Sequence, residues 1–341
     1  MNDEVTFTLG GRYIVDKKSF AYANEAVLYP AGSNEGLDPG VVYVFDFVDP
    51  FDGKRTDKMW AARAQVNYEP NDDLLLYLGF NRGVRGGGFN APLLPTSYFV
   101  SDEYFSYKPE VLNSYEGGFK YTLPSGIGRI NGSAYYYDYN NFQAFSIIGL
   151  DTFTLNGNAQ NYGFELETFL NPADGLDIGL GVGYIHAKVT DVPGVTDDIV
   201  LPDGSGDVVP ALLPPGSSTT PVQTPQWNLN GLARYEVPVS SLSGAIALQT
   251  DFQYRSTHYF NLTKFPAATQ KGYAVVNGSV AWIPDAGNYE VRFSVDNVFD
   301  KEYLVQIFDL SGTLEEGGFW GMIEQYYGRP RTWKVSAKIN F

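Results

Sequence analysis

The chain has 341 residues, of which 16% are aromatic and only 18% are charged, whereas charged residues make up about a quarter of an ordinary soluble protein. Its net charge of −16 argues against a nucleic-acid partner, because phosphate binding requires a basic face. The absence of cysteine excludes a disulfide framework and thiolate metal sites.

No run of about 18 apolar residues occurs, so the sequence predicts no transmembrane helix. A membrane β-barrel spreads its apolar residues over alternate positions, which fits the low charge and the many aromatics. A large soluble all-β protein is the alternative on composition alone. The first residues, Met-Asn-Asp-Glu, lack the regions of a signal peptide, and because an exported barrel needs one, we expect the natural N-terminus to be missing.

The first predicted strand runs from Val5 to Asp16 and has apolar residues on one face. In chain order, the same two-residue period recurs at 74–80, 176–184, 246–254 and 289–295. The opposite face of the segment 289–295 is polar and carries Glu290, Arg292 and Ser294. We expect about twelve such strands in the chain.

The connections between these strands alternate in length. Short clusters of Pro, Gly, Asn and Asp predict tight turns at 70–73, 124–128, 172–175, 238–244 and 284–288. Long polar connections are predicted at 17–58, 85–111, 191–226 and 301–330, with shorter ones at 149–155 and 261–272. This alternation is typical of an antiparallel outer-membrane barrel with short periplasmic turns and long extracellular loops, and a sandwich or propeller does not require it.

The last strand shows which face meets lipid. One face carries Trp333, Val335, Ile339 and Phe341, and the other carries lysines such as Lys334. A lysine against lipid near mid-membrane costs about 2–4 kcal/mol, so the apolar face must meet lipid and the lysines must point into the lumen.

Three pairs of aromatics lie eight residues apart on one face of a strand: Trp60 with Tyr68, Trp227 with Tyr235, and Trp333 with Phe341. Eight residues of a tilted strand span roughly 20 Å along the membrane normal. This is close to the separation of the two aromatic girdles that border the apolar band of a barrel, about 25 Å tall. The spacing therefore favours the membrane barrel over a soluble all-β protein.

Several stretches resemble TonB-dependent outer-membrane receptors. They are Tyr-Leu-Gly-Phe-Asn-Arg-Gly-Val-Arg-Gly-Gly-Gly-Phe-Asn at 77–90, the strand entry at 108–120, Tyr-Gly-Phe-Glu-Leu-Glu at 162–167, Asp-Asn-Val-Phe-Asp-Lys-Glu-Tyr at 296–303, and Gly-Arg-Pro-Arg-Thr-Trp at 328–333 before a terminal Phe341. The resemblance implies a partial barrel: residues 1–341 would be the C-terminal portion, about twelve strands of a likely 22. The family's plug domain and N-terminal strands are not recognisable here.

The resemblance implies that the intact parent performs TonB-energised uptake of a scarce nutrient, such as an iron–siderophore or similar chelate or a glycan, across the outer membrane of a Gram-negative bacterium. The implied partners are outer-membrane lipid, the TonB complex through the missing plug, the barrel-assembly machinery and the small-molecule ligand. No catalytic constellation and no cofactor motif is recognisable, so we expect no enzyme. A passive porin of about twelve strands and a structural or adhesive barrel remain alternatives.

Ligand binding is expected at the extracellular mouth, where aromatics and arginines suit stacking and anion capture. The candidates are Arg82, Arg85, Phe89, Tyr98, Tyr104, Tyr259, Phe319, Trp320, Tyr326 and Tyr327. For each of them, loop packing or girdle anchoring is the alternative. The resemblance implies a barrel-assembly signal at Trp333, Val335, Ile339 and Phe341. The two histidines, His186 and His258, are expected to be rim residues, so no metal site is predicted.

Overall fold

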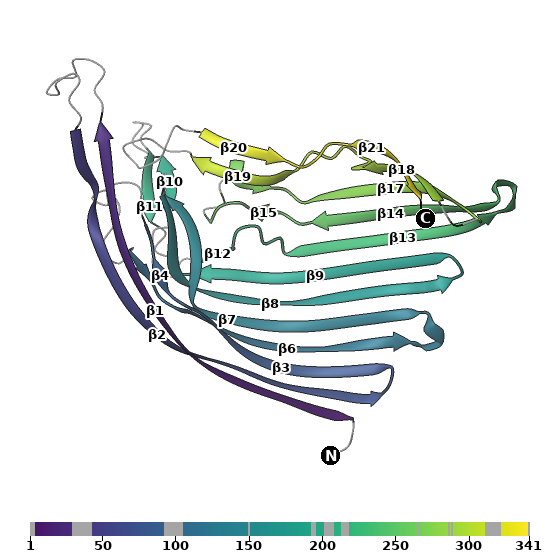
Figure 1. Cartoon of the computed structure of the whole chain (residues 1–341), viewed down its shortest axis with the longest axis horizontal. Coiled ribbons are helices and arrows are strands. Elements are labelled where there is room, and N and C mark those ends of the chain that lie inside the picture. Colours follow the sequence, from purple (N-terminus) through teal and green to yellow (C-terminus); the bar gives the residue numbers. More distant parts are fainter. Residues whose placement is uncertain are drawn as a thin grey trace.

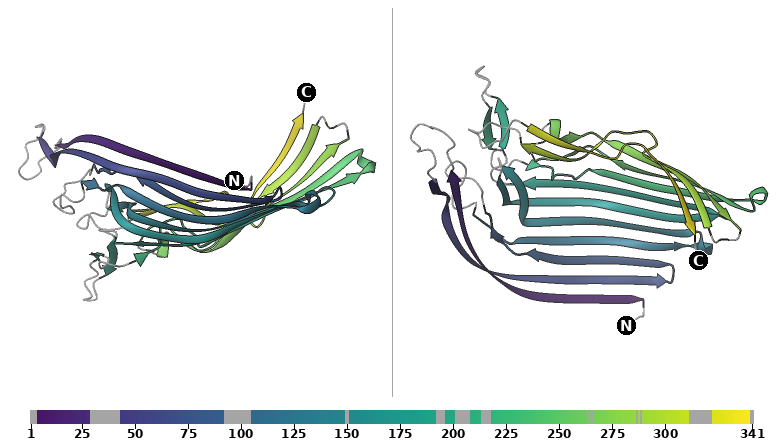
Figure 2. Two further views of the ribbon diagram at one scale, coloured as in Figure 1. Left: turned by 90° about the horizontal axis from the view of Figure 1, so that it is seen from below. Right: turned by 45° about the horizontal axis from the view of Figure 1, so that its top comes forward.

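The structure, a computed structural model, describes residues 4–28, 43–91, 105–148, 151–191, 196–200, 208–212, 218–262, 264, 266–285, 287, 289–310 and 322–339. Most of these residues belong to one antiparallel sheet, which is curved into an open trough (Figures 1 and 2). Within the described ranges, no helix has the length and apolar character needed to span a membrane.

Consecutive strands of this sheet are neighbours, as in a meander. In spatial order they are β1 (Val5–Leu28), β2 (Tyr43–Asn71), β3 (Leu74–Arg85), β6 (Glu110–Leu123), β7 (Gly128–Ile148), β8 (Asp151–Ala173), β9 (Leu176–Thr190), β13 (Trp227–Val239), β14 (Gly244–Arg255), β17 (Tyr273–Pro284), β18 (Tyr289–Asp296) and β21 (Thr332–Ile339). The short β12 (Ser218–Thr219) pairs with β9. The expectation of about twelve antiparallel strands is confirmed.

The predicted tight turns all lie at one end of the sheet, on the right in Figure 1. Two of them contain a single turn of 3-10 helix, Pro124–Gly126 and Ser240–Leu242. In the turn between β8 and β9, Gly175 has φ +74°, and a Cβ there would collide with the backbone of Glu236. Only glycine is unstrained at such a position, so local turn chemistry explains why this turn was predictable.

The long connections contain more strand than predicted. The connection expected at 17–58 is strand up to Leu28 and again from Tyr43, and the one expected at 149–155 is strand from Asp151 onward. Four further hairpins or strand pairs occupy the others: β4 (Gly88–Phe89) with β5 (Ser106–Tyr107), β10 (Thr196–Val200) with β11 (Val208–Leu212), β15 (His258–Tyr259) with β16 (Thr269–Gln270), and β19 (Leu304–Leu310) with β20 (Met322–Tyr327). Lys17, Lys18, Asp52 and Lys54 show why the prediction stopped early: polar residues on both faces erase the two-residue period.

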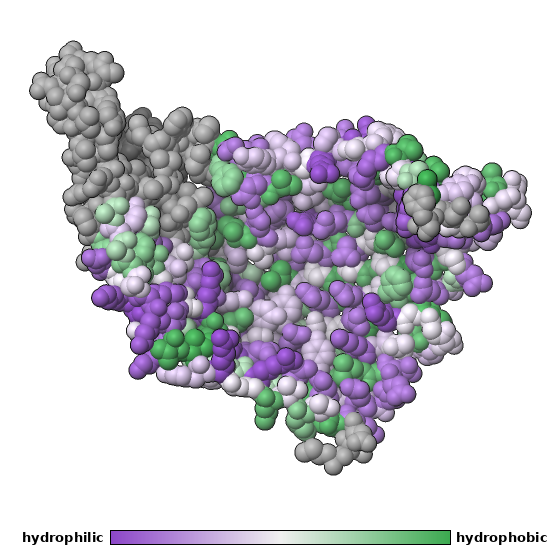
Figure 3. Space-filling model, viewed as in Figure 1, coloured by the Kyte–Doolittle hydropathy of each residue, from purple (hydrophilic) through white to green (hydrophobic). Residues whose placement is uncertain are grey.

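The register gathers the apolar positions on one face. Phe7 lies opposite Val66, Val66 opposite Leu78, and the same row continues through Phe164, Tyr184 and Trp227. Leu9 is 81% exposed and Val335 76% exposed, so this face has no protein cover. The face seen in Figure 3 is largely hydrophilic over the strands, with scattered hydrophobic residues.

The opposite, polar face lines the trough. Lys334 pairs with Asp296 at 2.6 Å and Arg292 with Glu290 at 2.8 Å, on the face that was expected to be the lumen. Trp60, Tyr68, Trp227 and Tyr235 share the exposed apolar face as the girdle spacing predicts, whereas Phe341 lies outside the described residues.

β1 and β21 form the two ends of the sheet, which Figure 1 and the right-hand view of Figure 2 show as separate. No ladder joins them within the described ranges, and the register ends with Val5–Leu28 on one side and Thr332–Ile339 on the other. The fold is therefore a partial barrel, as predicted. Such an edge leaves backbone N–H and C=O groups unpaired, which is unfavourable in lipid.

Candidate ligand-binding mouth

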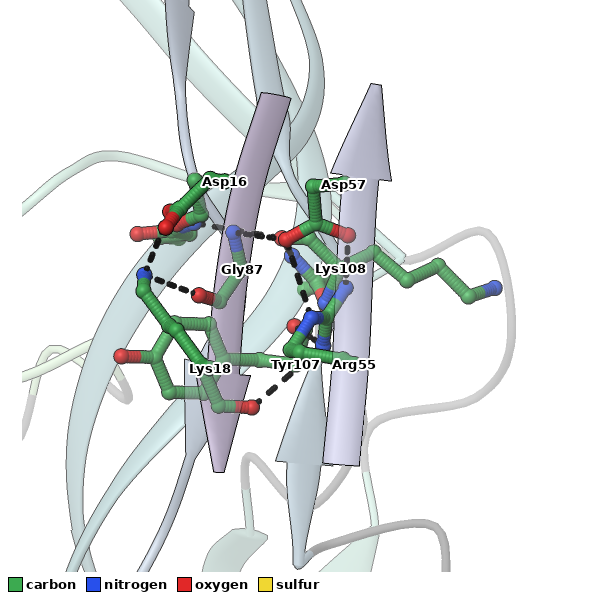
Figure 4. Close-up of polar contacts among 11 residues, drawn as sticks. Asp16, Lys18, Arg55, Asp57, Gly87, Tyr107 and Lys108 are labelled. Atoms are coloured by element: carbon green, nitrogen blue, oxygen red, sulfur yellow. Dashed lines mark hydrogen bonds and ion pairs between the residues drawn. The ribbon is translucent and has the colours of Figure 1, made fainter. Parts of the chain in front are cut away.

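The segment after β3 folds back over the polar face of β1 and β2, beyond Trp60 on the extracellular side. Lys18 donates to the carbonyl of Gly87 at 2.6 Å, and the Gly87 N–H donates to Asp57 at 3.1 Å. Arg55 holds Asp57 through two hydrogen bonds of 2.8 and 2.9 Å and also donates to the carbonyl of Tyr107. Figure 4 shows these side chains converging on Gly87, and the side chain of Lys108 extending away from them.

The glycines at 86–88 are needed for close approach. A Cβ on Gly86 would lie 2.5 Å from the carboxylate of Asp16, and one on Gly87 would collide with Arg55 and with the backbone of Tyr107. None of the three has a positive φ. The absence of a side chain at these positions lets the loop backbone touch the charged side chains.

Asp57 is 8% exposed and carries the main charge of this contact. Burial by itself raises its pKa, but the hydrogen bond and charge of Arg55, the N–H of Gly87 and the charge of Lys18 outweigh burial and leave the pKa below 3.8. The carboxylate is therefore ionised at neutral pH, and its ionisation favours the closed loop.

We expect this loop contact to weaken in acid. Because the pKa of Asp57 is lowered by the contact, the stabilisation is complete above 3.8 and is lost as the pH falls through the lowered pKa. The protection of the Gly87 amide against hydrogen exchange, corrected for intrinsic rates, should fall below that pH. In Asp57→Asn the protection of the Gly87 amide should be low and independent of pH. The same dependence of protection on pH in both proteins would contradict the role of ionised Asp57 in holding the loop.

The same loop is held on its other side by β7 and β8. Gln143 donates to the carbonyls of Gly86 and Lys108 at 2.9 and 3.1 Å, and Asn90 exchanges two hydrogen bonds with the backbone of Thr154, at 2.9 and 3.0 Å. The backbone N–H of Lys108 donates to Asn156. The loop therefore bridges strands that are far apart in the sheet and narrows the mouth from one side.

An aromatic cluster lies next to this bridge. Phe89 stacks on Phe20 at 5.3 Å between ring centroids, and Phe51 stacks on Phe105 at 4.8 Å. Phe51 and Phe89 lie 6.0 Å apart, so the four rings are continuous. Their edges and faces offer a site for stacking by a planar ligand group.

The side of the mouth opposite this loop, here called the opposite bank, is formed by β15, β16 and the start of β17. Tyr273 stacks on Tyr303 at 4.6 Å, and Gln270 accepts a hydrogen bond from the backbone of Leu304 at 2.7 Å. Burial lowers the pKa of His258, whose Nδ1 lies 3.0 Å from the carbonyl of Ser256. The histidine is a packed rim residue, as expected.

The motif at 296–303 forms the turn that supports this bank. Asn297 is 2% exposed, has φ +52°, and bonds the backbones of Lys301 and Arg329 at 2.8–3.1 Å. Asp300 accepts a hydrogen bond from the backbone N–H of Arg331 at 2.8 Å. The two recognised C-terminal motifs, 296–303 and 328–333, are therefore two halves of one packed structure.

Five of the ten predicted ligand-binding residues are described near the mouth: Arg85, Phe89, Tyr259, Tyr326 and Tyr327. Arg85 is exposed at the end of β3, and no ion pair involves it in the described part of the chain. Lys264 lies over the ring of Tyr259 at 5.3 Å. Tyr326 and Tyr327 are exposed and donate to Glu324 and Gln325 on their own strand. Four others, Tyr98, Tyr104, Phe319 and Trp320, lie outside the described residues.

Arg82 does not lie where it was expected. It pairs in register with Ala62, on the apolar face, and its guanidinium lies 4.2 Å from the ring centre of Trp60. Its place was readable from the sequence, because Arg82 has the same parity as Leu78 and Phe80. A side chain on the outward face cannot contact a ligand in the lumen.

Sequence reasoning missed Lys18, Arg55, Asp57, Phe20 and Phe51. All five fall inside the region predicted as a loop, at 17–58. A signal was present in Asp16 with Lys18 and in Arg55 with Asp57: opposite charges two residues apart share one face of a strand.

The predicted barrel-assembly residues Trp333, Val335 and Ile339 lie exposed on the apolar face of the edge strand β21. Their role in assembly stays a prediction. Over the described ranges, no group of three or more His, Asp or Glu side chains is placed to hold a metal ion. His186, which stacks on Tyr162 at 4.9 Å, lies on the outward face.

A family model for the TonB dependent receptor-like beta-barrel matches residues 1–298, most of the chain. Among solved structures, the ferric yersiniabactin uptake receptor FyuA from Yersinia pestis superposes with a TM-score of 0.70 at 18% identity, covering 100% of this chain and 44% of that one. The ferric-catecholate import receptor Fiu from E. coli K12 gives 0.62 at 16% identity, covering 98% and 42%.

The ferric preacinetobactin receptor BauA from Acinetobacter baumannii gives a TM-score of 0.61 at 16% identity and covers 100% of this chain and 41% of that one. Identities this low show a shared fold alone. The chain spans less than half the length of each of these three receptors.

Proposed function

Because this chain belongs to the TonB-dependent receptor-like β-barrel family, we propose that residues 1–341 form the C-terminal portion of the barrel wall of a receptor. That receptor takes up a ferric chelate with energy supplied through TonB. The chain is a bacterial outer-membrane protein, and its continuous apolar face meets lipid.

The observation that carries the ligand class is the charge at the mouth. Arg85, at the end of β3, and Lys108, whose side chain extends away from the loop contact in Figure 4, are both exposed, and neither forms an ion pair within the described ranges. Lys264 lies over Tyr259 on the opposite bank. In a chain of net charge −16, exposed cations without ion pairs at the same end of the sheet as a cluster of stacked rings suit a ligand that is both anionic and aromatic. The three solved receptors of this fold named above are receptors for ferric ligands.

The partners belong to the same proposal. A plug within the barrel would engage the TonB complex, and the exposed aliphatic and aromatic side chains of β21 would be read by the barrel-assembly machinery. No catalytic role is proposed. A closed porin of twelve strands requires a ladder between β1 and β21, and the described residues contain none, so the open sheet disfavours that alternative.

Replacing both mouth cations, Arg85→Gln with Lys108→Gln, should weaken binding of a ferric catecholate chelate about tenfold or more, because two charge-assisted contacts are lost. The measurement is quenching of intrinsic fluorescence by the chelate, with the receptor extracted from outer membranes. Arg129→Gln, a cation on the same face near the periplasmic turns, is the matched control and should leave affinity unchanged.

Uptake of radioactive iron by cells carrying the receptor should require TonB. Equal uptake in cells lacking TonB would refute the transport proposal. Unchanged affinity in the double variant would instead leave transport standing and place the binding site elsewhere.

A further inference from the structure

A polar cavity of about 300 Å³ opens between β7, β8 and β9. Among its lining residues are Asp138, Asn140, Asn158, Gln160, Lys188 and Thr190. A cavity lined by amides, a carboxylate and an ammonium group is unexpected on the side of a barrel that meets lipid.

The cavity faces outward, away from the mouth. In the register, Tyr136, Tyr162 and His186 form an outward row, and Asp138, Gln160 and Lys188 form the next row on the same face. The intervening residues Ala159 and Val189 point to the lumen side and are buried, at 3% and 1% exposure. Gln160 and Lys188, by contrast, are exposed.

A β-bulge opens this cavity. The pairing of β7 with β8 shifts between Tyr139 and Phe142, and Asn141 has φ +54°. The bulge leaves Asn140 and Asn141 without partners in the β7–β8 ladder and separates the two strands locally. The backbone N–H of Asn141 is satisfied instead by the side chain of Asn158, at 3.4 Å.

The cavity holds one unpaired cation. Asp138 accepts a hydrogen bond from Asn140 at 3.4 Å, and Asn158 donates to Asp191 at 3.3 Å. Lys188 forms no ion pair or hydrogen bond within the part of the chain that is described. A second cation, Arg82, lies on the same outward face farther along the sheet and bonds Asn113 at 3.0 Å.

The level of the cavity identifies what it meets. The row of Asp138, Gln160 and Lys188 lies two residues beyond the row of Tyr136, Tyr162 and His186 along each strand. This corresponds to roughly 5 Å along the membrane normal, toward the extracellular side. Aromatic girdles mark the border of the hydrocarbon, so this row lies among the headgroups of the outer leaflet.

We propose that this cavity binds the phosphorylated sugar headgroup of an outer-leaflet glycolipid. Lys188 takes the phosphate, while Gln160, Asn158 and Asp138 take sugar hydroxyls, which both donate and accept hydrogen bonds. A phospholipid headgroup has a phosphate but presents far fewer hydroxyls to this set of amides and carboxylate, so the glycolipid is the favoured occupant.

The test uses the full receptor, stripped of lipid and folded into phosphatidylethanolamine vesicles containing a small fraction of diphosphorylated glucosamine-disaccharide lipid. Bound glycolipid per protein is measured by native mass spectrometry. Lys188→Gln should raise the dissociation constant about tenfold or more, and Gln160→Ala should raise it less. Lys120→Gln, an exposed strand lysine on the lumen face, is the matched control and should bind as the unchanged protein does.

Three results would overturn the site: equal affinity in Lys188→Gln and the unchanged protein, equal binding of phosphatidylglycerol and the glycolipid, or displacement of the glycolipid by millimolar inorganic phosphate. The last of these would mean that phosphate alone is recognised. Because Lys188 and Gln160 are both exposed, the folded state of each variant can be checked by its heat-dependent gel mobility before binding is compared.

Discussion

Replacing Arg55 with alanine is expected to increase the opening of the loop at 86–91 roughly a hundredfold. The side chain holds Asp57 through two hydrogen bonds and also reaches the carbonyl of Tyr107. Asp57 is almost fully buried, so removal of Arg55 leaves its charge with only the Gly87 N–H and the charge of Lys18 to offset burial, at a cost of about 3 kcal/mol. The rate of trypsin cleavage after Arg85, measured under conditions where the loop opens and closes much faster than it is cleaved, reports this change in the open population.

The double variant Arg55→Ala with Asp57→Ala separates the charge from the packing. With both charges removed, the buried carboxylate is gone, and the loop should open less often than in Arg55→Ala alone. Arg63→Ala is a matched control, because Arg63 lies on the same face of β2 and, among the described residues, bonds only Gln65 on its own strand. Cleavage in the double variant as fast as in Arg55→Ala would mean that packing, not the buried charge, closes the loop.

Introducing arginine at Leu78 should destabilise the folded protein in vesicles by about 2–4 kcal/mol. Leu78 lies on the exposed apolar face near the middle of β3, where an arginine would have to enter the hydrocarbon. The measurement is equilibrium unfolding in urea in lipid vesicles, followed by tryptophan fluorescence. The same substitution at Asn81, on the polar face of the same strand, serves as control and should change the free energy of unfolding only slightly.

If Leu78→Arg and Asn81→Arg are both as stable as the unchanged protein, the assignment of the two faces is wrong. An equal loss in both would point to a general intolerance of β3 to arginine. Only a difference between them supports the register of the whole sheet, because every row of the sheet is linked to this one by cross-strand pairs.

Much of this fold was predictable because the information is local. The two-residue period of a strand separates Val335 from Lys334 without knowledge of any partner strand, and turns such as that at Gly175 require a residue that tolerates positive φ. Strand number, the two faces, the short turns and the girdle pairs all follow from such local rules.

The mouth and the outward cavity depended on tertiary structure. Asp57 bonds Gly87, 30 residues away, and Gln143 bonds Gly86, 57 residues away; no local pattern predicts either contact. The parts of β1 and β2 that fall within 17–58 carry polar residues on both faces. A two-residue period therefore does not reveal them as strands, and they are strands because they pair with each other. The cavity at Lys188 exists because a bulge near Asn141 displaces one strand against its neighbour. The sequence by itself thus determined which face of each strand meets lipid, while the packing of distant segments decided which polar groups meet one another and which remain free to bind.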